Sequence, residues 1–358
     1  MLCGGERLTK KLRNRLLFVL FLIANVAVFV FIALGDDQID QFIPSLRNIK
    51  PMWLAICLTC SFLYVVFDGL MIDAAMRPLA KNLSRWYNIK MGLLGKYYNA
   101  ITPFATGGQP FQMYHYHRKG IPTAISATGL MLKFIVFQFV TTCMCTVGLI
   151  IFGSTLYQQS AVIFWCSVGG LIINSVLPLI VIGAAKYSKQ LQGFIGWFVR
   201  VGAKLRLIKK TEDAFAKLEQ TREQLDASVW LIRQRPRIIL PMFFYGVAER
   251  VCLLLVTYFL YRAFGLHGDS LIKILFLTEM LNIAVAYFPT PGTAGAAEAG
   301  YNIVFRHLFG GASSVAVLLW RLLTYYVILV AGFLFVMLDS LRHKRAIEYD
   351  TPVEGEAA

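Results

Sequence analysis

Charged residues are scarce in this sequence. Asp, Glu, Lys and Arg make up 15% of its 358 residues, whereas 57% are hydrophobic and the mean hydropathy is +0.61. A soluble domain normally carries about a quarter charged residues, because water must solvate its surface. This chain has too much apolar surface to fold in water alone. We therefore expect lipid to be part of its solvent, and we expect no room for a separate soluble catalytic domain.

The sequence motifs of several enzyme classes are also missing. There is no Gly-x-x-x-x-Gly-Lys-[Ser/Thr] loop, so we do not expect this chain to drive a pump with ATP, and there is no His-Glu-x-x-His zinc pattern. Cys57 and Cys60 have the spacing of a metal or redox pair, but no second cysteine pair or histidine cluster accompanies them. We expect these cysteines to act as small apolar residues, and we expect neither a metal nor a cofactor.

Acidic residues are fewer than basic ones, 20 against 35, which gives a net charge of +15. We do not expect this excess to bind nucleic acid, because the basic residues gather at the ends of predicted helices and in connecting segments. That placement is typical of segments that face the cytoplasm and anionic lipid. The apolar run 16–34 follows a basic start, as in a signal peptide, but no small-x-small cleavage site closes it. We interpret it as a first transmembrane helix.

The sequence does contain a series of apolar stretches that reach the roughly 20 residues needed to cross a bilayer. They cover residues 16–34, 53–76, 121–152, 161–185, 238–264 and 314–338. We therefore predict an all-α polytopic membrane protein with about six transmembrane helices. Clusters of Lys and Arg set the orientation and place both termini in the cytoplasm. The segment after the second predicted helix is assigned to the same side by Arg77, Lys81, Arg85, Lys90 and Lys96.

Two further apolar segments are interrupted by glycine and proline. Residues 91–104 and 111–117 flank the first break, and each half is too short to span the membrane. Basic residues lie at both ends, so we predict a re-entrant hairpin that enters from the cytoplasmic side. Residues 271–288 and 296–309 flank the second break, which would enter from the outer side. Because these halves are longer, two full crossings remain an alternative.

The broken segments lie at matching places in two halves of the chain, about 1–152 and about 161–345. Each half has two predicted spans, a broken segment and a further span, and the halves start on opposite sides. The breaks are also alike: Thr102-Pro103 precedes Gly107-Gly108, and Thr290-Pro291 precedes Gly292 and Gly295. We predict an inverted repeat in a single domain, 1–345, with a transport site near the midplane, followed by a disordered tail at 346–358.

The two breaks should expose polar backbone groups inside the membrane. Irregular backbone inside a membrane is tolerated only where protein or a wet cavity satisfies it. The half-helix that starts after each break would direct its free N–H groups into that cavity, where they suit an anion such as a lipid phosphate. Glycines would allow a headgroup to approach the backbone, and prolines would enforce the break. The alternative is a pair of kinks that serve packing only.

Ionisable residues inside apolar segments are costly and are therefore candidates for function. They are Asp68, Asp73, Lys133, Glu249, Arg250, Glu279, Glu298 and Arg321, of which Asp73 and Arg250 are expected to lie at shallow depth. We expect an interior acid–base pair such as Glu298 with Arg321. The basic groups could bind phosphate, while the acids compensate them or relay protons. The alternative is that these residues form structural ion pairs that hold helices together.

The segment 186–237 carries twelve basic and five acidic residues. Its apolar residues recur at helical spacing between Arg200, Lys204 and Arg206, which predicts an amphipathic helix on the inner leaflet. The alternative is a simple cytoplasmic connector that obeys the positive-inside rule.

Three motifs resemble the transmembrane, flippase region of the lysylphosphatidylglycerol synthase family. They are Gly107-Gly108-Gln109-Pro110 followed by Tyr114 and Gly120, the run from Pro289 to Glu298, and the run from Trp320 to Tyr326. The resemblance covers nearly the whole chain. Many relatives have a second glycine where this chain has Thr293, and many have Glu where it has Gln109. These departures bear on any mechanism in which that glutamate binds a proton or a headgroup.

The resemblance implies a lipid translocase in a bacterial inner membrane, acting on lysyl-phosphatidylglycerol or on another anionic, aminoacylated or polyprenyl lipid. Relatives with an additional cytoplasmic domain transfer lysine from lysyl-tRNA to phosphatidylglycerol, and the product repels cationic antimicrobial peptides. This chain ends about 20 residues after its last predicted helix, so we do not expect it to catalyse that transfer alone. The candidate headgroup-binding residues are Thr102, Pro103, Gly107, Gly108, Gln109, Pro110, Tyr114, Lys133, Glu249, Arg250, Glu279, Pro289, Thr290, Pro291, Gly292, Gly295, Glu298 and Arg321.

Two other functions remain alternatives. The first is a membrane-embedded or partner-dependent lysyltransferase, with Glu249, Glu279 or Glu298 as general base and His115 and His117 near the first hairpin. The second is a non-catalytic subunit that recruits a separate lysyl-lipid synthase through the segment 186–237. Membrane phospholipid is the expected partner in each case, and a homo-oligomer is left open.

Overall fold

The computed structural model describes residues 49–80, 83–176 and 234–350, together with the isolated positions 44, 47, 227 and 230. Side chains are described as far as residue 339. Across these residues the chain is helical and contains no strand, as predicted. The predicted first transmembrane helix, nearly all of the basic segment 186–237 and the last eight residues lie outside the described residues.

Four helical segments are long and apolar enough to cross a membrane, which confirms a polytopic membrane protein. They are Pro51–Met76, Thr123–Gln159, Pro236–Ala263 and Pro291–Asp339. The first two are α3 and α6, and the third contains α9 (Ile239–Ala263). The helix Ala161–Val176 is the described part of the predicted span 161–185.

The fourth apolar segment is not one regular helix. It contains α11 (Ala296–Phe309), α12 (Ser313–Arg321) and α13 (Val327–Asp350). Between α12 and α13 the backbone forms a π-helical turn, Leu322–Tyr326. Such turns insert an extra residue into a helix and are frequent at functional sites.

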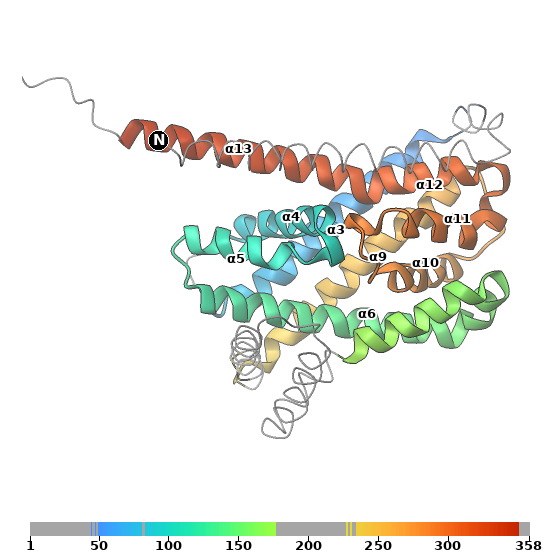
Figure 1. Ribbon diagram of the computed structural model, residues 1–358, viewed down its shortest axis with the longest axis horizontal. Coiled ribbons are helices and arrows are strands. Elements are labelled where there is room, and N and C mark those ends of the chain that lie inside the picture. The colour runs from blue at the N-terminus through green and yellow to red at the C-terminus, as the bar shows by residue number, and fades with distance from the viewer. Residues whose placement is uncertain are drawn as a thin grey trace, which may run out of the picture.

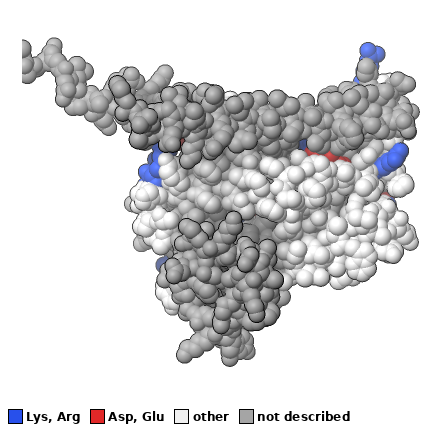
Figure 2. All heavy atoms as spheres, viewed as in Figure 1, with Lys and Arg blue, Asp and Glu red and all other residues white. Residues whose placement is uncertain are grey.

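The outer surface of the described helices is apolar, as a lipid-facing surface should be. Phe62 on α3 is 65% exposed, Ile150 on α6 is 78% exposed and Trp165 is 63% exposed. Figure 2 shows a face whose described part is almost entirely uncharged, with charged atoms at its margins. In water this surface would be a large apolar patch, whereas in a bilayer the acyl chains cover it.

Helices α3 and α9 form the centre of the molecule and pack against each other more extensively than any other described pair (Figure 1). They are antiparallel, because the N–H of Lys50, just before α3, donates to the carbonyl of Ala263 at the end of α9 over 3.0 Å. Both helices are apolar around most of their circumference, which is typical of helices surrounded by other helices and lipid.

Each broken segment forms a hairpin of two short helices. The first hairpin is α4 (Arg85–Ile101) with α5 (Gly108–Arg118), and the second is α10 (Leu271–Val285) with α11. At 1.5 Å per residue, the 15 residues of α10 and the 14 of α11 cover only about 21–23 Å each, whereas a bilayer core is about 30 Å thick. Two full crossings therefore do not fit, and both broken segments are hairpins.

The hairpins pack in a symmetric way. Helix α4 packs against α13, the last helix of the second half, and α10 packs against α6, the last helix of the first half. In Figure 1 the hairpins lie on opposite sides of the molecule, with α6 and α13 along its two long edges. This exchange of partners is what two oppositely oriented halves produce, and it brings the two breaks into contact with each other.

Candidate functional site

The two breaks follow the same backbone path. In each, an extended threonine precedes a proline that starts a short 3-10 turn, Pro103–Ala105 in the first break and Pro291–Thr293 in the second. The last two residues of each turn have left-handed backbone: Phe104 and Ala105 have φ of 54° and 51°, and Gly292 and Thr293 have φ of 61° and 57°. A non-glycine residue in this region costs about 1–3 kcal/mol and persists only where the surrounding structure holds it.

The second break is fixed to both halves of the protein. The guanidinium of Arg321 donates through Nη2 to the carbonyl of Gly292 over 3.0 Å. The hydroxyl of Tyr325 donates to the carbonyl of Ala100, at the end of α4, over 3.0 Å. A Cβ at Gly292 would lie 2.3 Å from the Tyr325 ring, so this close approach requires glycine.

The helix ends after the breaks are capped by the protein's own oxygens. Gly107 donates to Thr102 Oγ1 over 2.9 Å, Gly108 donates to Asn99 Oδ1 over 2.8 Å, and Gly295 donates to Glu298 Oε2 over 2.7 Å. These three N–H groups are therefore not free to bind an anion, because side chains nearby in the sequence satisfy them first. Any anion bound here must rely mainly on side-chain cations.

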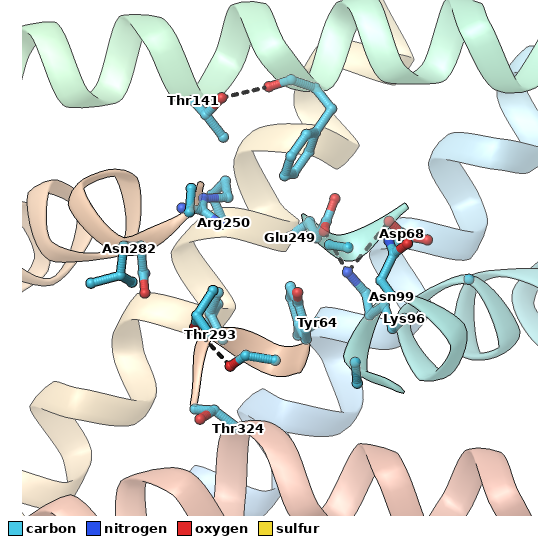
Figure 3. Close-up of a pocket in the computed structure, with 18 of the residues that line it drawn as sticks. Tyr64, Asp68, Lys96, Asn99, Thr141, Glu249, Arg250, Asn282, Thr293 and Thr324 are labelled. Carbon is cyan, nitrogen blue, oxygen red and sulfur yellow. Dashed lines mark hydrogen bonds and ion pairs between the residues drawn. The ribbon is translucent and has the colours of Figure 1, made fainter. Parts of the chain in front are cut away.

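A cavity of about 790 Å³ lies where the two breaks meet (Figure 3). Residues of both breaks line it, together with residues of α3, α4, α6, α9 and α12. Its lining includes four basic side chains, one from each of four helices: Lys96 (α4), Lys133 (α6), Arg250 (α9) and Arg321 (α12). The cavity is thus shared between the halves and carries positive groups from both.

Lys96 is at the centre of one charged cluster. Its Nζ lies 2.6 Å from Glu249 Oε1 and 3.4 Å from Asp68 Oδ1, and 3.5 Å from the centroid of the Tyr64 ring. The same oxygen of Asp68 lies 2.5 Å from Nζ of Lys133. These contacts require α3 and α4 to approach closely, and a Cβ at Gly69 would lie 2.3 Å from the Cα of Ile89 on α4.

The sequence places Lys96 both among the basic residues after the second predicted helix and within the broken segment 91–104, and the structure buries it. Lys96 lies in the fourth turn of α4, where its side chain is 11% exposed. The positive-inside rule counts every basic residue near a predicted helix end. It does not distinguish a basic residue in a loop from one on a short re-entrant helix. Lys96 is stable at this depth because two carboxylates neutralise it.

Two further buried ion pairs adjoin the cavity. Arg250 donates through Nε and Nη2 to Oε2 of Glu279, over 3.1 and 2.7 Å. Arg321 donates through Nε to Oε1 of Glu298 over 2.6 Å, which confirms the predicted pair. Arg250 is only 8% exposed and lines the cavity.

Asp73 does not belong to this site. It lies in the last turn of α3, where it contacts Arg77 at 2.8 Å and Arg85 at 3.4 Å, and it does not line the cavity. Lys133 and Arg321, by contrast, are related by the internal repeat. The sequence separation between Lys133 and Arg321 equals that between Thr102 and Thr290. Each follows its break on the next long helix, and each binds a buried acid.

The structure divides the predicted site residues into three groups. Those that line the cavity are Gln109, Lys133, Glu249, Arg250, Gly292 and Arg321. Those that support it from behind, by an ion pair or by shaping a break, are Thr102, Pro103, Gly107, Gly108, Pro110, Glu279, Pro289, Thr290, Pro291, Gly295 and Glu298. Tyr114 lies outside, because its ring is 56% exposed and contacts Arg118 rather than the cavity. His115 and His117 do not line the cavity either.

The sequence analysis missed a neutral polar group on one wall of the cavity. Asn174 donates to Thr141 Oγ1 over 3.0 Å and to Thr142 Oγ1 over 3.1 Å, and it accepts from the hydroxyl of Tyr287 over 3.1 Å. Gln138 on α6 also donates to Asn174. Burying an Asn or Gln side chain in an apolar stretch is also costly, as it is for a charged one. Gln138 and Asn174 could therefore have been identified from the sequence as candidate site residues.

The charges of the site are balanced. Around the cavity, the described cations Lys96, Lys133, Arg250 and Arg321 are matched by Asp68, Glu249, Glu279 and Glu298. Every glutamate around the cavity is thus held by a cation. Cations that share acids with one another can exchange partners when a phosphate arrives.

Comparison with known protein families gives one match over most of the chain. The family model described as "Lysylphosphatidylglycerol synthase TM region" matches residues 16–332 of the chain. The match includes both breaks and all eight of the charged residues around the cavity. No curated protein matches the chain.

Proposed function

This chain belongs to the family of the lysylphosphatidylglycerol synthase transmembrane region, and from that premise we propose that it moves a phospholipid between the leaflets of its membrane. The observation that carries the proposal is the cavity at which two broken hairpins of opposite orientation meet. Interrupted helices that meet between two inverted halves are typical of transport sites near the bilayer midplane. A lipid function is also what the family description implies.

The four cations give the cavity a way to hold a phosphate. Arg250 and Arg321 have planar guanidinium groups that can bind phosphate oxygens in pairs, and Lys133 is the more exposed of the two lysines, at 19% of its side chain. A volume of about 790 Å³ falls within the roughly 300–1,000 Å³ of typical ligand pockets. We propose that the headgroup occupies this space while the acyl chains remain in the surrounding lipid.

Movement of the lipid requires the cavity to open to each side in turn. In our proposal the two halves rock against each other along the α3–α9 pair, and the strained breaks act as the joints. The contacts of Tyr325 with Ala100 and of Arg321 with Gly292 would be remade in each cycle. Transport would run downhill or be coupled to an ion, since the sequence has no ATP-binding loop.

The lipid we propose is lysyl-phosphatidylglycerol or another anionic, aminoacylated or polyprenyl lipid. Its display on the outer leaflet of a bacterial inner membrane would raise resistance to cationic antimicrobial peptides. A separate synthase would supply the aminoacylated lipid, and we propose the basic segment 186–237 as its docking region. In this arrangement both chain termini lie in the cytoplasm.

The test is leaflet exchange in liposomes. Purified protein would be reconstituted with fluorescent lysyl-phosphatidylglycerol or phosphatidylglycerol, and the outer-leaflet label would be followed by chemical quenching. We expect wild type to speed exchange over empty liposomes and Arg321→Ala to lose at least about 90% of the gain, which corresponds to about 1.4 kcal/mol or more. Cys166→Ser, at an exposed residue outside the cavity, is the matched control and should exchange as wild type. If wild type moves none of these lipids faster than empty liposomes, the proposal is wrong, and headgroup transfer becomes the function to assay.

A further inference from the structure

An anion that enters the cavity would disturb the balance of charges there. Lys96, Lys133, Asp68 and Glu249 form one connected cluster with two positive and two negative groups. Their side chains are 1–19% exposed, so water screens them weakly. A phosphate that binds Lys133 would leave this cluster with an uncompensated negative charge, which is costly in a weakly solvated site.

Glu249 is placed where it could compensate that negative charge. It is fully buried, lines the cavity and gives Oε1 to Lys96, but its other oxygen, Oε2, is buried with no hydrogen-bond partner among the described residues. A carboxylate oxygen without a donor is rare in a folded protein and needs a reason. Figure 3 shows Glu249 and Asp68 close to Lys96, with dashed lines for their contacts with it.

The groups around Glu249 come from several helices, and the π-helical turn Leu322–Tyr326, which also packs on α9, contributes Tyr325 to the cavity lining. Asp68 and Tyr64 face it from α3, and Lys133 faces it from α6, while Lys96 reaches it from α4. Glu279 on α10 is held by Arg250, the next residue after Glu249, and Arg321 on α12 is held by Glu298. Cys252 lies on the same helix. Among the described acids with a buried, unpartnered oxygen, Glu249 lines the cavity, whereas Glu279, whose Oε1 also has no partner, does not.

We propose that Glu249 takes up one proton when a lipid phosphate binds in the cavity, so that the lipid and the proton cross the membrane together. This inference rests on the proposed function and names the ion that would drive it. The proton comes from the water on the side to which the cavity opens, and it binds Oε2. The resulting O–H can donate to a phosphate oxygen, while Lys133 and Lys96 remain neutralised by Asp68 and the phosphate. When the lipid leaves, the proton returns to water on the other side.

The test counts protons at the binding step, without any transport. Detergent-solubilised protein would be titrated with dihexanoyl-phosphatidylglycerol in weakly buffered solution, with a pH dye as the readout. We expect about one proton taken up per lipid bound by wild type, and an affinity that falls about tenfold per pH unit as pH rises through the coupled range. Glu249→Gln should bind the lipid with no proton uptake and with an affinity that does not change with pH.

Asp269→Asn is the matched control, because Asp269 pairs with Lys273 at the start of α10, away from the cavity. It should take up the same proton as wild type. Binding by wild type without proton uptake overturns the inference and leaves the translocase proposal standing. Proton uptake that survives in Glu249→Gln also overturns it, since the proton would then reside elsewhere. Absence of binding by wild type overturns the headgroup site and the inference together. If Glu249→Gln does not fold, the wild-type proton count and its pH dependence decide.

Discussion

Substitutions at Arg321 should separate its contribution to the stability of the protein from its contribution to lipid binding. The Arg321 side chain is 8% exposed, and it holds both Oε1 of Glu298 and the carbonyl of Gly292. Without it, the Glu298 carboxylate stays buried with the N–H of Gly295 as its remaining donor. Breaking a buried pair on one side costs about 3–5 kcal/mol, because the other charge is left uncompensated. We expect Arg321→Ala to lose that much free energy of unfolding.

The assay is a double-mutant cycle of Arg321→Ala, Glu298→Gln and the two together. Unfolding would be followed in one detergent, and leaflet exchange would be measured for each variant that folds. The double variant carries no orphaned charge, and a glutamine can still accept from Gly295, so it should recover at least about 2 kcal/mol of the loss. Its exchange should stay at least about tenfold below wild type, because the phosphate has lost a cation.

Two results would refute this reasoning. If Arg321→Ala unfolds like wild type, the buried pair does not carry the free energy that its burial implies. If the double variant regains both stability and exchange, Arg321 serves only to neutralise Glu298, and the phosphate is bound without it. Arg321→Lys completes the set: it keeps the charge but cannot hold Glu298 and Gly292 with one planar group, so it should show an intermediate exchange rate.

Two other substitutions test the rest of the site. Lys96→Met should destabilise the protein by about 3–5 kcal/mol in denaturation, since it removes the cation that contacts the buried Glu249 and leaves Asp68 with Lys133 alone, and adding Glu249→Gln should recover part of that loss. An unchanged midpoint for Lys96→Met would mean that the cluster is hydrated. Gly292→Ala should cost more than about 2 kcal/mol and slow exchange, because its Cβ would lie 2.3 Å from Tyr325 and its φ is 61°. Gly169→Ala meets no atom within 4 Å and is the control, so equal losses at both glycines would contradict the geometry.

The sequence by itself was enough to predict the architecture. Apolar runs of this length need lipid to cover them, and Thr-Pro followed by glycine disfavours a continuous helix. These are local properties, so the positions of both hairpins and their repetition could be identified without the fold. Ionisable residues in apolar runs had to face the interior, which is why Lys133, Glu249, Glu279 and Arg321 were found in advance.

Only the tertiary structure determined which charged side chains form ion pairs with one another. Asp68 and Glu249 share Lys96 because α3 packs along α9 and because Gly69 lets α4 approach α3, and these contacts join residues that are far apart in the chain. In the packed structure Lys96 and Arg250 line the cavity, whereas Tyr114 lies outside it. Partner choice depends on side-chain distances of a few ångströms, and those distances exist only after the two halves have packed together.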